Sequence, residues 1–438
     1  MVAAWPLAGD NERMETPQEA ISAGVKSGSR TDEIRQAAAK LFEARGYSST
    51  TITDIADAAG ILPGSLYYHF ESKEAVALEI VADFERDAAE LASTLSERIE
   101  ESGAGSARAQ LTRTAEAIAE LSARNHAALR ITAYAAPATA TERFHEARES
   151  ATTSLAQVWE RLVGDLVPEA SDSQDIGLLR FALDNLTLNV SLNLAETARP
   201  GSVAGLNTAM LLDGIALDVP GDEDLDRSAA MVAARDAIAA WGPSYEPAEP
   251  NSREHIVAAA RVEFARRGFD ATTVRDLAEA AQVGMATLYR RVTSKDELLR
   301  DILGAYDAHF DAAVRAALTA GGSAVESLDA LAFVLISAKR RFRLESEIVK
   351  LSNPRTAPAP VALESYWAST GARLRLLESM LERGIREASI RPLAAPAEMG
   401  PQIRFICWVP YQDLARATPE RAHRFLRNSM LRGFLTPR

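Results

Sequence analysis

Cysteine is almost absent from this chain, since Cys407 is the only one among 438 residues. No intrachain disulfide can therefore form, and we expect a reducing compartment, the cytoplasm. Aromatic residues make up only 6% of the sequence, and no apolar run reaches the ~18 residues that span a membrane. Alternation of apolar and polar residues is rare, which disfavours β-sheets. What remains is rich in Ala, Leu, Arg and Glu, as in stacked amphipathic helices, so we expect an all-α fold.

Positive charge is also in short supply. The formal net charge is −13 at pH 7, which argues against a general attraction to nucleic acid. Locally the balance is better, because residues 30–75 carry five Lys or Arg against seven Asp or Glu, and residues 252–297 carry eight against seven. Any binding of DNA must therefore depend on a few placed cations.

Motifs for catalysis and cofactor binding are missing. The six histidines lack the spacing of metal ligands, and the sequence has neither a glycine-rich phosphate loop nor a serine nucleophile elbow. We therefore expect that the protein is not an enzyme and holds neither a metal nor a cofactor.

What the chain does contain is one pattern of 41 residues twice. Residues 34–74 and 256–296 align without a gap and are identical at 16 of the 41 positions. The two copies lie 222 residues apart, about half the chain, so the repeat predicts two similar halves fused head to tail.

Each copy predicts three short helices. In the first copy, apolar residues at helical spacing form a helix that ends at Gly46. Thr51 followed by Asp54 predicts a capping box at the start of the second helix, and Thr273 with Asp276 repeats it.

The third helix of each copy follows a tight connection. Its inward residues are expected to be Leu66 and Phe70 in the first copy, and Leu288 and Val292 in the second. The outward residues are small, polar or cationic: Gly64, Ser65, Tyr68 and His69, then Ala286, Thr287, Arg290 and Arg291. A short turn between two helices, the second with such a face, is the helix-turn-helix pattern that fits the major groove.

Both copies resemble the DNA-binding domain of the tetracycline-repressor (TetR) family of bacterial transcription regulators. In the first copy the resemblance is carried by Phe42, Gly46, Thr50, Thr51, Asp54, Ala56, Ala59, Leu66, Tyr67, Ser72 and Lys73. In the second it is carried by Phe264, Gly268, Thr272, Thr273, Asp276, Ala278, Ala281, Leu288, Tyr289, Ser294 and Lys295. The departures from the family pattern are Leu62 in the first copy and Glu263, Gln282, Arg291 and Val292 in the second.

The resemblance implies two kinds of contact with a double-stranded DNA operator. Phosphates, which position a domain without specifying sequence, are expected to meet Thr51, Tyr67, Lys73, Thr273, Tyr289 and Lys295. Base edges are expected to meet Gly64, Ser65, Tyr68, His69, Thr287, Arg290 and Arg291. Lys26, Arg30 and Arg35 are candidates for a phosphate-binding arm. Either third helix could instead be a structural remnant, so DNA binding by the second head stays open.

The resemblance also implies a helical bundle behind each head, which binds an effector and dimerises. We expect a disordered leader over residues 1–27, heads over 28–88 and 251–310, bundles over 89–241 and 311–438, and a linker over 242–250. The candidate dimerisation segments are residues 173–217 and 396–434. The effector is an unknown small molecule, and its contact residues are unknown.

Together these observations favour a sequence-specific transcriptional regulator, in particular a ligand-responsive repressor with two TetR-like units. The two halves are expected to form an intramolecular pseudo-dimer on an asymmetric operator, because their third helices differ. A homodimer that presents four heads is the other arrangement. The rival function is a ligand-binding or protein-interaction module in which one or both heads are vestigial, and the acidic net charge favours it.

Overall fold

The computed structural model describes residues 30–47, 49–101, 107–133, 140–166, 173–193, 198–242, 249–351, 360–409 and 417–436. Within these ranges the elements are helices, with one isolated antiparallel bridge between Ala216 and Ile390, so the all-α prediction is confirmed. The expected leader and most of the linker lie outside the described residues. None of the described helices is both long and apolar enough to cross a membrane.

The first half begins with a three-helix head and continues as a bundle. Its elements are α1 (Arg30–Arg45), α2 (Ile52–Ala58), α3 (Pro63–His69), α4 (Lys73–Glu101), α5 (Ala107–Arg124), α6 (His126–Ala133), α7 (Glu142–Ser150), α8 (Thr153–Leu166), α9 (Ser173–Leu188), α10 (Val190–Asn193) and α11 (Pro200–Asp213). In the bundle, α5 packs against α9 and α11, and α8 packs against α4 and α9. Trp159 on α8 and Phe84 on α4 are fully buried in this core.

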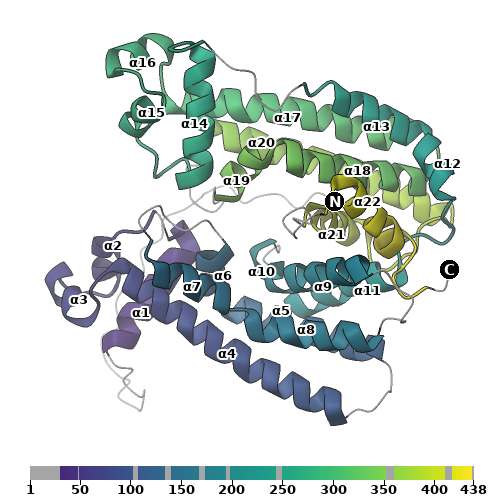
Figure 1. Ribbon diagram of the computed structural model, residues 1–438, viewed down its shortest axis with the longest axis horizontal. Coiled ribbons are helices and arrows are strands. Elements are labelled where there is room, and N and C mark those ends of the chain that lie inside the picture. Colours follow the sequence, from purple (N-terminus) through teal and green to yellow (C-terminus); the bar gives the residue numbers. More distant parts are fainter. Residues whose placement is uncertain are drawn as a thin grey trace, which may run out of the picture.

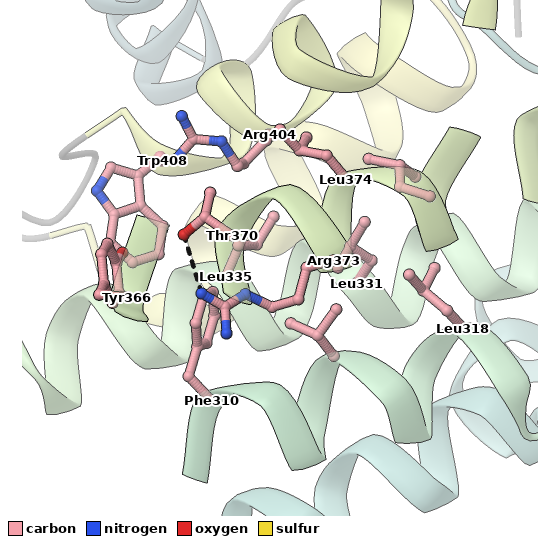
Figure 2. Close-up of a pocket in the computed structure, with 12 residues that line it drawn as sticks. Phe310, Leu318, Leu331, Leu335, Tyr366, Thr370, Arg373, Leu374, Arg404 and Trp408 are labelled. Carbon is pink, nitrogen blue, oxygen red and sulfur yellow. Dashed lines mark hydrogen bonds between the residues drawn. The ribbon is translucent and has the colours of Figure 1, made fainter. Parts of the chain in front are cut away.

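The second half repeats this plan with its own head and bundle. Its elements are α14 (Arg253–Arg267), α15 (Val274–Ala280), α16 (Met285–Arg291), α17 (Lys295–Thr319), α18 (Ala324–Arg341), α19 (Arg343–Leu351), α20 (Val361–Arg386), α21 (Pro396–Trp408), α22 (Pro419–Leu426) and the π-helical turn η2 (Arg427–Leu431). Helices α17, α18, α20 and α21 surround a largely apolar cavity (Figure 2).

Two helices between the halves pack on the second bundle. Helix α13 (Ala229–Ala239), which follows α12 (Asp222–Arg227), buries Ala230, Met231 and Ala234 and lies against α17 and α18. Just beyond it, the indole nitrogen of Trp241 donates a hydrogen bond of 3.1 Å to the carbonyl oxygen of His309. We expected residues up to 241 to belong to the first bundle, but this segment packs with the second.

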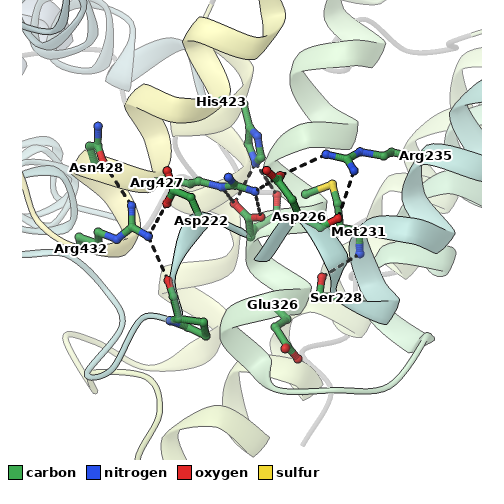
Figure 3. Close-up of polar contacts among 12 residues, drawn as sticks. Asp222, Asp226, Ser228, Met231, Arg235, Glu326, His423, Arg427, Asn428 and Arg432 are labelled. Carbon is green, nitrogen blue, oxygen red and sulfur yellow. Dashed lines mark hydrogen bonds and ion pairs between the residues drawn. The ribbon is translucent and has the colours of Figure 1, made fainter. Parts of the chain in front are cut away.

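A buried ion network fastens this segment to the second half (Figure 3). Arg427 Nε and Nη2 donate to the two carboxylate oxygens of Asp329 at 2.8 and 2.7 Å, and Nη2 also reaches Asp226 of α12 at 2.8 Å. His423 Nε2 lies 2.8 Å from Asp329 Oδ1. Burial alone would raise the pKa of Asp329, but hydrogen bonds from His423 and Arg427 hold this pKa below its ordinary value.

The two halves meet along their last helices, and both heads lie at one end of the molecule (Figure 1). Helix α11 contacts α21 and η2, and α9 contacts α21 and α22. An ion pair of 2.6 Å joins Arg421 of α22 to Asp175 of α9. These contacts bring together the segments 173–217 and 396–434 that the sequence marked as candidates for dimerisation.

Two glycines cross backbone to backbone at this junction. Gly214 follows α11 with φ 75°, and Gly433 follows η2 with φ 94°. A Cβ atom on Gly214 would come within 2.5 Å of the nitrogen of Gly433, and one on Gly433 within 2.5 Å of the carbonyl oxygen of Asp213. Only glycine fits both the left-handed backbone and the close approach.

The backbone hydrogen bonds around this crossing are reciprocal. The two residues that follow each glycine donate their amides to carbonyl oxygens just before the other glycine. The first of these amides bonds to the carbonyl three residues before the other glycine. The second bonds to the carbonyl two residues before it. The four bonds are Ile215 to Met430 at 2.8 Å, Phe434 to Leu211 at 3.0 Å, Ala216 to Leu431 at 3.1 Å and Leu435 to Leu212 at 3.0 Å. Such self-complementary pairing is the property of a twofold interface, here within one chain.

Candidate nucleic-acid interface

The second helix of each head begins with a complete capping box. Thr51 Oγ1 accepts a hydrogen bond from the Asp54 amide at 3.1 Å, and the Thr51 amide donates to Asp54 Oδ2 at 2.7 Å. The corresponding distances between Thr273 and Asp276 are 3.2 and 2.8 Å. Hydrogen bonds from the threonine side chains, and then from their backbone amides, hold the pKa of both aspartates below the ordinary value. The capping boxes predicted from the sequence are therefore present in both heads.

The third helices present the predicted faces. Leu66, Phe70, Leu288 and Val292 are buried, so the predicted inward residues are confirmed. Most of the outward residues named from the sequence are exposed: Gly64, Ser65, Tyr68, Ala286, Arg290 and Arg291. Tyr67 and Tyr289, which were expected at phosphates, are exposed as well. His69 and Thr287 are half-buried. At the start of the second helices, Thr51 and Thr273 are exposed.

Side chains on the two faces also contact one another. The ring of Tyr68, which is 88% exposed, meets that of His69 edge to face with centroids 5.3 Å apart. In the second head, Arg290 Nη2 donates to Thr287 Oγ1 at 3.0 Å, which orients the guanidinium on the outer surface of α16. The first face is therefore mainly aromatic, while the second carries two arginines.

The two lysines expected at phosphates have internal partners. Lys73 Nζ donates to the carbonyl oxygens of Tyr47 and Thr50, both at 2.8 Å, and lies 4.3 Å from the centre of the Tyr47 ring. Burial lowers the pKa of Lys73. Two of its three N–H bonds thus close the loop between α1 and α2 onto the start of α4. A phosphate contact by this residue would have to use the third.

Lys295 repeats this arrangement in the second head. Its Nζ donates to the carbonyl oxygens of Phe269 at 2.7 Å and Thr272 at 3.0 Å, and lies 4.1 Å from the centre of the Phe269 ring. Burial lowers its pKa as well. We call each set of contacts, at Lys73 or at Lys295, a lysine clamp.

The predicted phosphate-binding arm is partly inside the described residues. Arg35 Nη2 lies 2.6 Å from Asp32 Oδ1, and Arg35 Nε lies 3.1 Å from Asp83 Oδ2 on α4. Arg30 is paired with Glu33. Arg35 therefore fastens α1 to α4, and Lys26 lies outside the described residues.

The geometry of both heads agrees with the comparison to known families. Residues 34–80 and 256–302 each match the model described as "Bacterial regulatory proteins, tetR family". The chain belongs to the TetR family. It carries the DNA-binding part of that family twice.

The similar proteins are regulators of transcription. The repressor KstR2 of Rhodococcus jostii (strain RHA1) is 55% identical over 69 residues, which are 16% of this chain and 33% of that protein. The negative regulator IcaR of the biofilm operon icaADBC in Staphylococcus aureus (strain Newman) is 47% identical over 45 residues, 10% of this chain and 24% of that protein. The solved structure of the probable transcriptional regulatory protein RHA5900 is 32% identical over 43% of this chain and 100% of that one, with a TM-score of 0.34. The chain thus spans a third or less of the curated relatives that it matches.

The second head departs from the TetR pattern in the turn before its third helix. Gln282 has φ 53°, and Gly60, its counterpart in the first head, has φ 65°. A left-handed backbone costs an ordinary L-residue roughly 1–2 kcal/mol. The second head therefore keeps the geometry of the TetR turn and bears local strain that the first head avoids.

The departure at Glu263 has a structural partner. Glu263 is 9% exposed, and its Oε2 lies 2.8 Å from Arg266 Nη2 and 3.0 Å from Arg267 Nε. Arg267 Nη1 in turn lies 3.1 Å from Asp276 Oδ1 on α15. Glu263 thus orients an arginine that connects α14 to α15, where the first head has the apolar Leu41.

One exposed cation was missed by the sequence reasoning. Arg275 on α15 is exposed and stands where α2 has Thr53. The sequence could have indicated Arg275, because it places a cation on the second helix of the head, two residues after the capping threonine. Arg275 adds to the positive charge of Arg290 and Arg291 in the second head.

Proposed function

We propose that this TetR-family protein is a cytoplasmic, sequence-specific DNA-binding regulator that acts as a repressor. The observation that carries the proposal is the exposed outer face of α3 and of α16, two third helices at one end of the molecule (Figure 1). The relatives KstR2 and IcaR, described as a repressor and a negative regulator, support repression rather than activation. The thirteen contact residues named from the sequence remain our proposal, with the lysine clamps adding a structural role for Lys73 and Lys295.

We infer that one chain acts as an intramolecular pseudo-dimer. Support comes from the contacts of α9 and α11 with α21, α22 and η2, and from the reciprocal backbone pairing around Gly214 and Gly433. A dimeric helix-turn-helix protein places its recognition helices in successive major grooves, about 34–36 Å apart. Here both heads belong to one chain, so the operator contains two different half-sites.

We propose the domain ranges expected from the sequence, except that the first bundle ends earlier. We propose a leader over residues 1–27, heads over 28–88 and 251–310, and a linker over 242–250. The first bundle runs from residue 89 to about Gly221, since α13 packs on α17 and α18 and Asp226 of α12 pairs with Arg427. The second bundle otherwise covers residues 311–438. The packing of α12 and α13 against the second half, just before the linker, favours one fixed arrangement of the two heads.

A small ligand is proposed to control this arrangement. The cavity in the second bundle supports the proposal. A ligand that binds more tightly to one spacing of the heads shifts the population toward that spacing. The coupling between ligand and DNA is then reciprocal.

The test combines two measurements on the full chain. Selection from random DNA is expected to return an asymmetric site whose binding weakens steeply with salt. Size exclusion with light scattering is expected to give the mass of one chain. A perfect palindrome, or an obligate dimer of chains in dilute solution, would contradict the pseudo-dimer.

The rival function is a ligand-binding or protein-interaction module with vestigial heads, which the net charge of −13 favours. This rival predicts that no sequence is enriched in the selection. It also predicts no salt-dependent binding to DNA flanking the coding region. Either result would replace the proposed function.

A further inference from the structure

The cavity in the second bundle has two chemically different ends (Figure 2). The space between the lining atoms is about 430 Å³ when the open mouth is counted. Leucines surround one end, and three aromatic rings with two guanidinium groups gather at the other. The residues on which the argument depends are Leu318 and Leu331 at the first end, and Phe310, Tyr366 and Trp408 at the second.

Arg373, one of the two arginines, already has partners. Its Nη1 lies 2.6 Å from Asp307 Oδ1 and 3.8 Å from Asp311 Oδ1, and its Nη2 donates to Thr370 Oγ1 at 3.0 Å. The guanidinium carbon lies 4.9 Å from the centre of the Phe310 ring. The charge of Arg373 is thus balanced within the protein, and its side chain is held in one orientation.

Arg404, on the facing helix α21, is not balanced in this way. Its Nε atom is buried without a hydrogen-bond partner, and the described residues supply no carboxylate to its guanidinium. Lys339 adds a second positive charge nearby, with Nζ 5.6 Å from the centre of the Trp408 ring. A buried polar N–H without an acceptor is unfavourable, and a carboxylate is the acceptor that a guanidinium binds best.

We propose that this cavity binds a small monocarboxylate with an extended apolar body. The carboxylate accepts hydrogen bonds from Arg404 at the aromatic end, and the body lies among the leucines. Burial of the apolar body supplies the affinity, and the arginine fixes the direction of the ligand. This inference rests on the proposed function, because it identifies the chemical class of the effector.

The first half does not repeat this charge. At the 222-residue period of the repeat, Arg373 corresponds to Ala151 and Arg404 to Ala182. The two crossing glycines are 219 residues apart, and at that spacing Arg404 corresponds to the neutral Asn185. The acid therefore binds in one half, and we expect one ligand per chain.

The test is calorimetric titration of the full chain, without DNA, with three probes of equal chain length. Decanoate carries the carboxylate, decanol lacks the charge and decyltrimethylammonium reverses it. We expect one decanoate per chain, with decanol at least about tenfold weaker, since the alcohol cannot accept charge-assisted hydrogen bonds from Arg404. Binding of decyltrimethylammonium is expected to be weaker still, because its charge repels Arg404.

Variants of the arginine make the assignment specific. Arg404→Gln should remove the preference for decanoate over decanol, and Arg404→Lys should retain part of it. Arg375→Gln is the matched control, because Arg375 is exposed on α20 and lies outside the cavity lining. Circular dichroism melting checks that each variant is folded, and the comparison of probes on the unaltered protein needs no variant.

The proposal is overturned if decanol binds as tightly as decanoate, or if Arg404→Gln keeps the preference. Two equal sites per chain would also overturn it. The effector role is tested separately, by titrating the selected DNA site with the protein in the presence and absence of decanoate. If decanoate binds selectively but leaves DNA affinity unchanged, the carboxylate site is supported. The proposed control of DNA binding by this ligand is then wrong.

Discussion

At the scale of single residues, the two heads differ most in the chemistry of their outer faces. The first presents Tyr68 and His69 in edge-to-face contact, and the second presents Arg290 and Arg291. A guanidinium can donate two hydrogen bonds to one guanine, whereas apolar side chains contact the methyl group of thymine. The two half-sites should therefore differ in base composition, with guanine in the half-site of α16.

The first prediction concerns Arg290. Arg290→Ala is expected to weaken binding by about 1–3 kcal/mol at the preferred base and to relax base preference at that position alone. Fluorescence anisotropy with operators substituted one base pair at a time measures this. Arg227→Ala is the control, because this exposed arginine on α12 carries the same charge outside the heads. An equal loss on every sequence would make Arg290 a phosphate contact.

A second prediction follows from the strained turn of the second head. Gln282→Gly is expected to stabilise that head by about 0.5–1 kcal/mol, since relief of the left-handed strain exceeds the entropy that glycine costs. Hydrogen exchange of the α15 and α16 amides reports this local stability. The reverse change, Gly60→Gln, should destabilise the first head by a similar amount. A loss of protection in Gln282→Gly would mean that the glutamine side chain has a stabilising contact.

At the scale of elements, the heads follow from local sequence signals and the bundles do not. Thr51 with Asp54 predicts a helix start, and Gly46 (φ 82°) marks a helix end, because each signal acts within one turn. The packing of α13 on α17 and α18 depends on residues far along the chain, and no periodicity identifies such a partner. The sequence thus predicted which helices form, but not on which half α13 lies.

The same distinction applies to the candidate site. The exposed outer residues of α3 and α16 were predicted because helical spacing decides which way a side chain points. The lysine clamps were missed, since Lys73 reaches carbonyl oxygens of residues 47 and 50, across two intervening helices. A lysine near a DNA-binding helix gives no sign of whether its ammonium points to phosphate or to its own backbone.

The third prediction separates these two roles. Lys73→Met and Lys295→Met are each expected to lower the local stability of their head by about 2 kcal/mol, because charge-assisted hydrogen bonds to two carbonyl oxygens are lost. Hydrogen exchange of the loop between the first two helices measures the loss without DNA. Lys40→Met is the control, since Lys40 is exposed in the first head. If the loop stays protected while binding weakens equally on all sequences, the lysine acts on phosphate and the clamp is unimportant.

At the scale of the whole molecule, the junction of the halves determines where the heads lie. In a symmetric dimer a single patch pairs with itself, and here two different segments make the same reciprocal bonds. The buried network of Asp329, His423 and Arg427 adds a contact that one half makes with the segment between the halves. Duplication followed by divergence at such positions accounts for a twofold junction with unlike heads.

The last prediction tests this junction through its glycines. Gly214→Ala and Gly433→Ala each introduce a methyl group against the opposite backbone in addition to left-handed strain. Gly321→Ala is the matched control, because Gly321 has φ 93° but no heavy atom within 4 Å of the added Cβ. The control is expected to cost roughly 1–2 kcal/mol, and both junction variants clearly more. Urea unfolding of the full chain measures the difference.

DNA binding gives the junction variants a second readout. A head that is no longer held at a fixed spacing binds one half-site at a time, so affinity for the complete operator should fall toward that for a single half-site. Affinity for an isolated half-site should stay unchanged, because α3 and α16 are not altered. If Gly433→Ala destabilises the chain no more than Gly321→Ala and leaves operator affinity intact, the crossing does not set the spacing of the heads. The junction would then lie in the remaining contacts of α9 and α11 with α21 and α22.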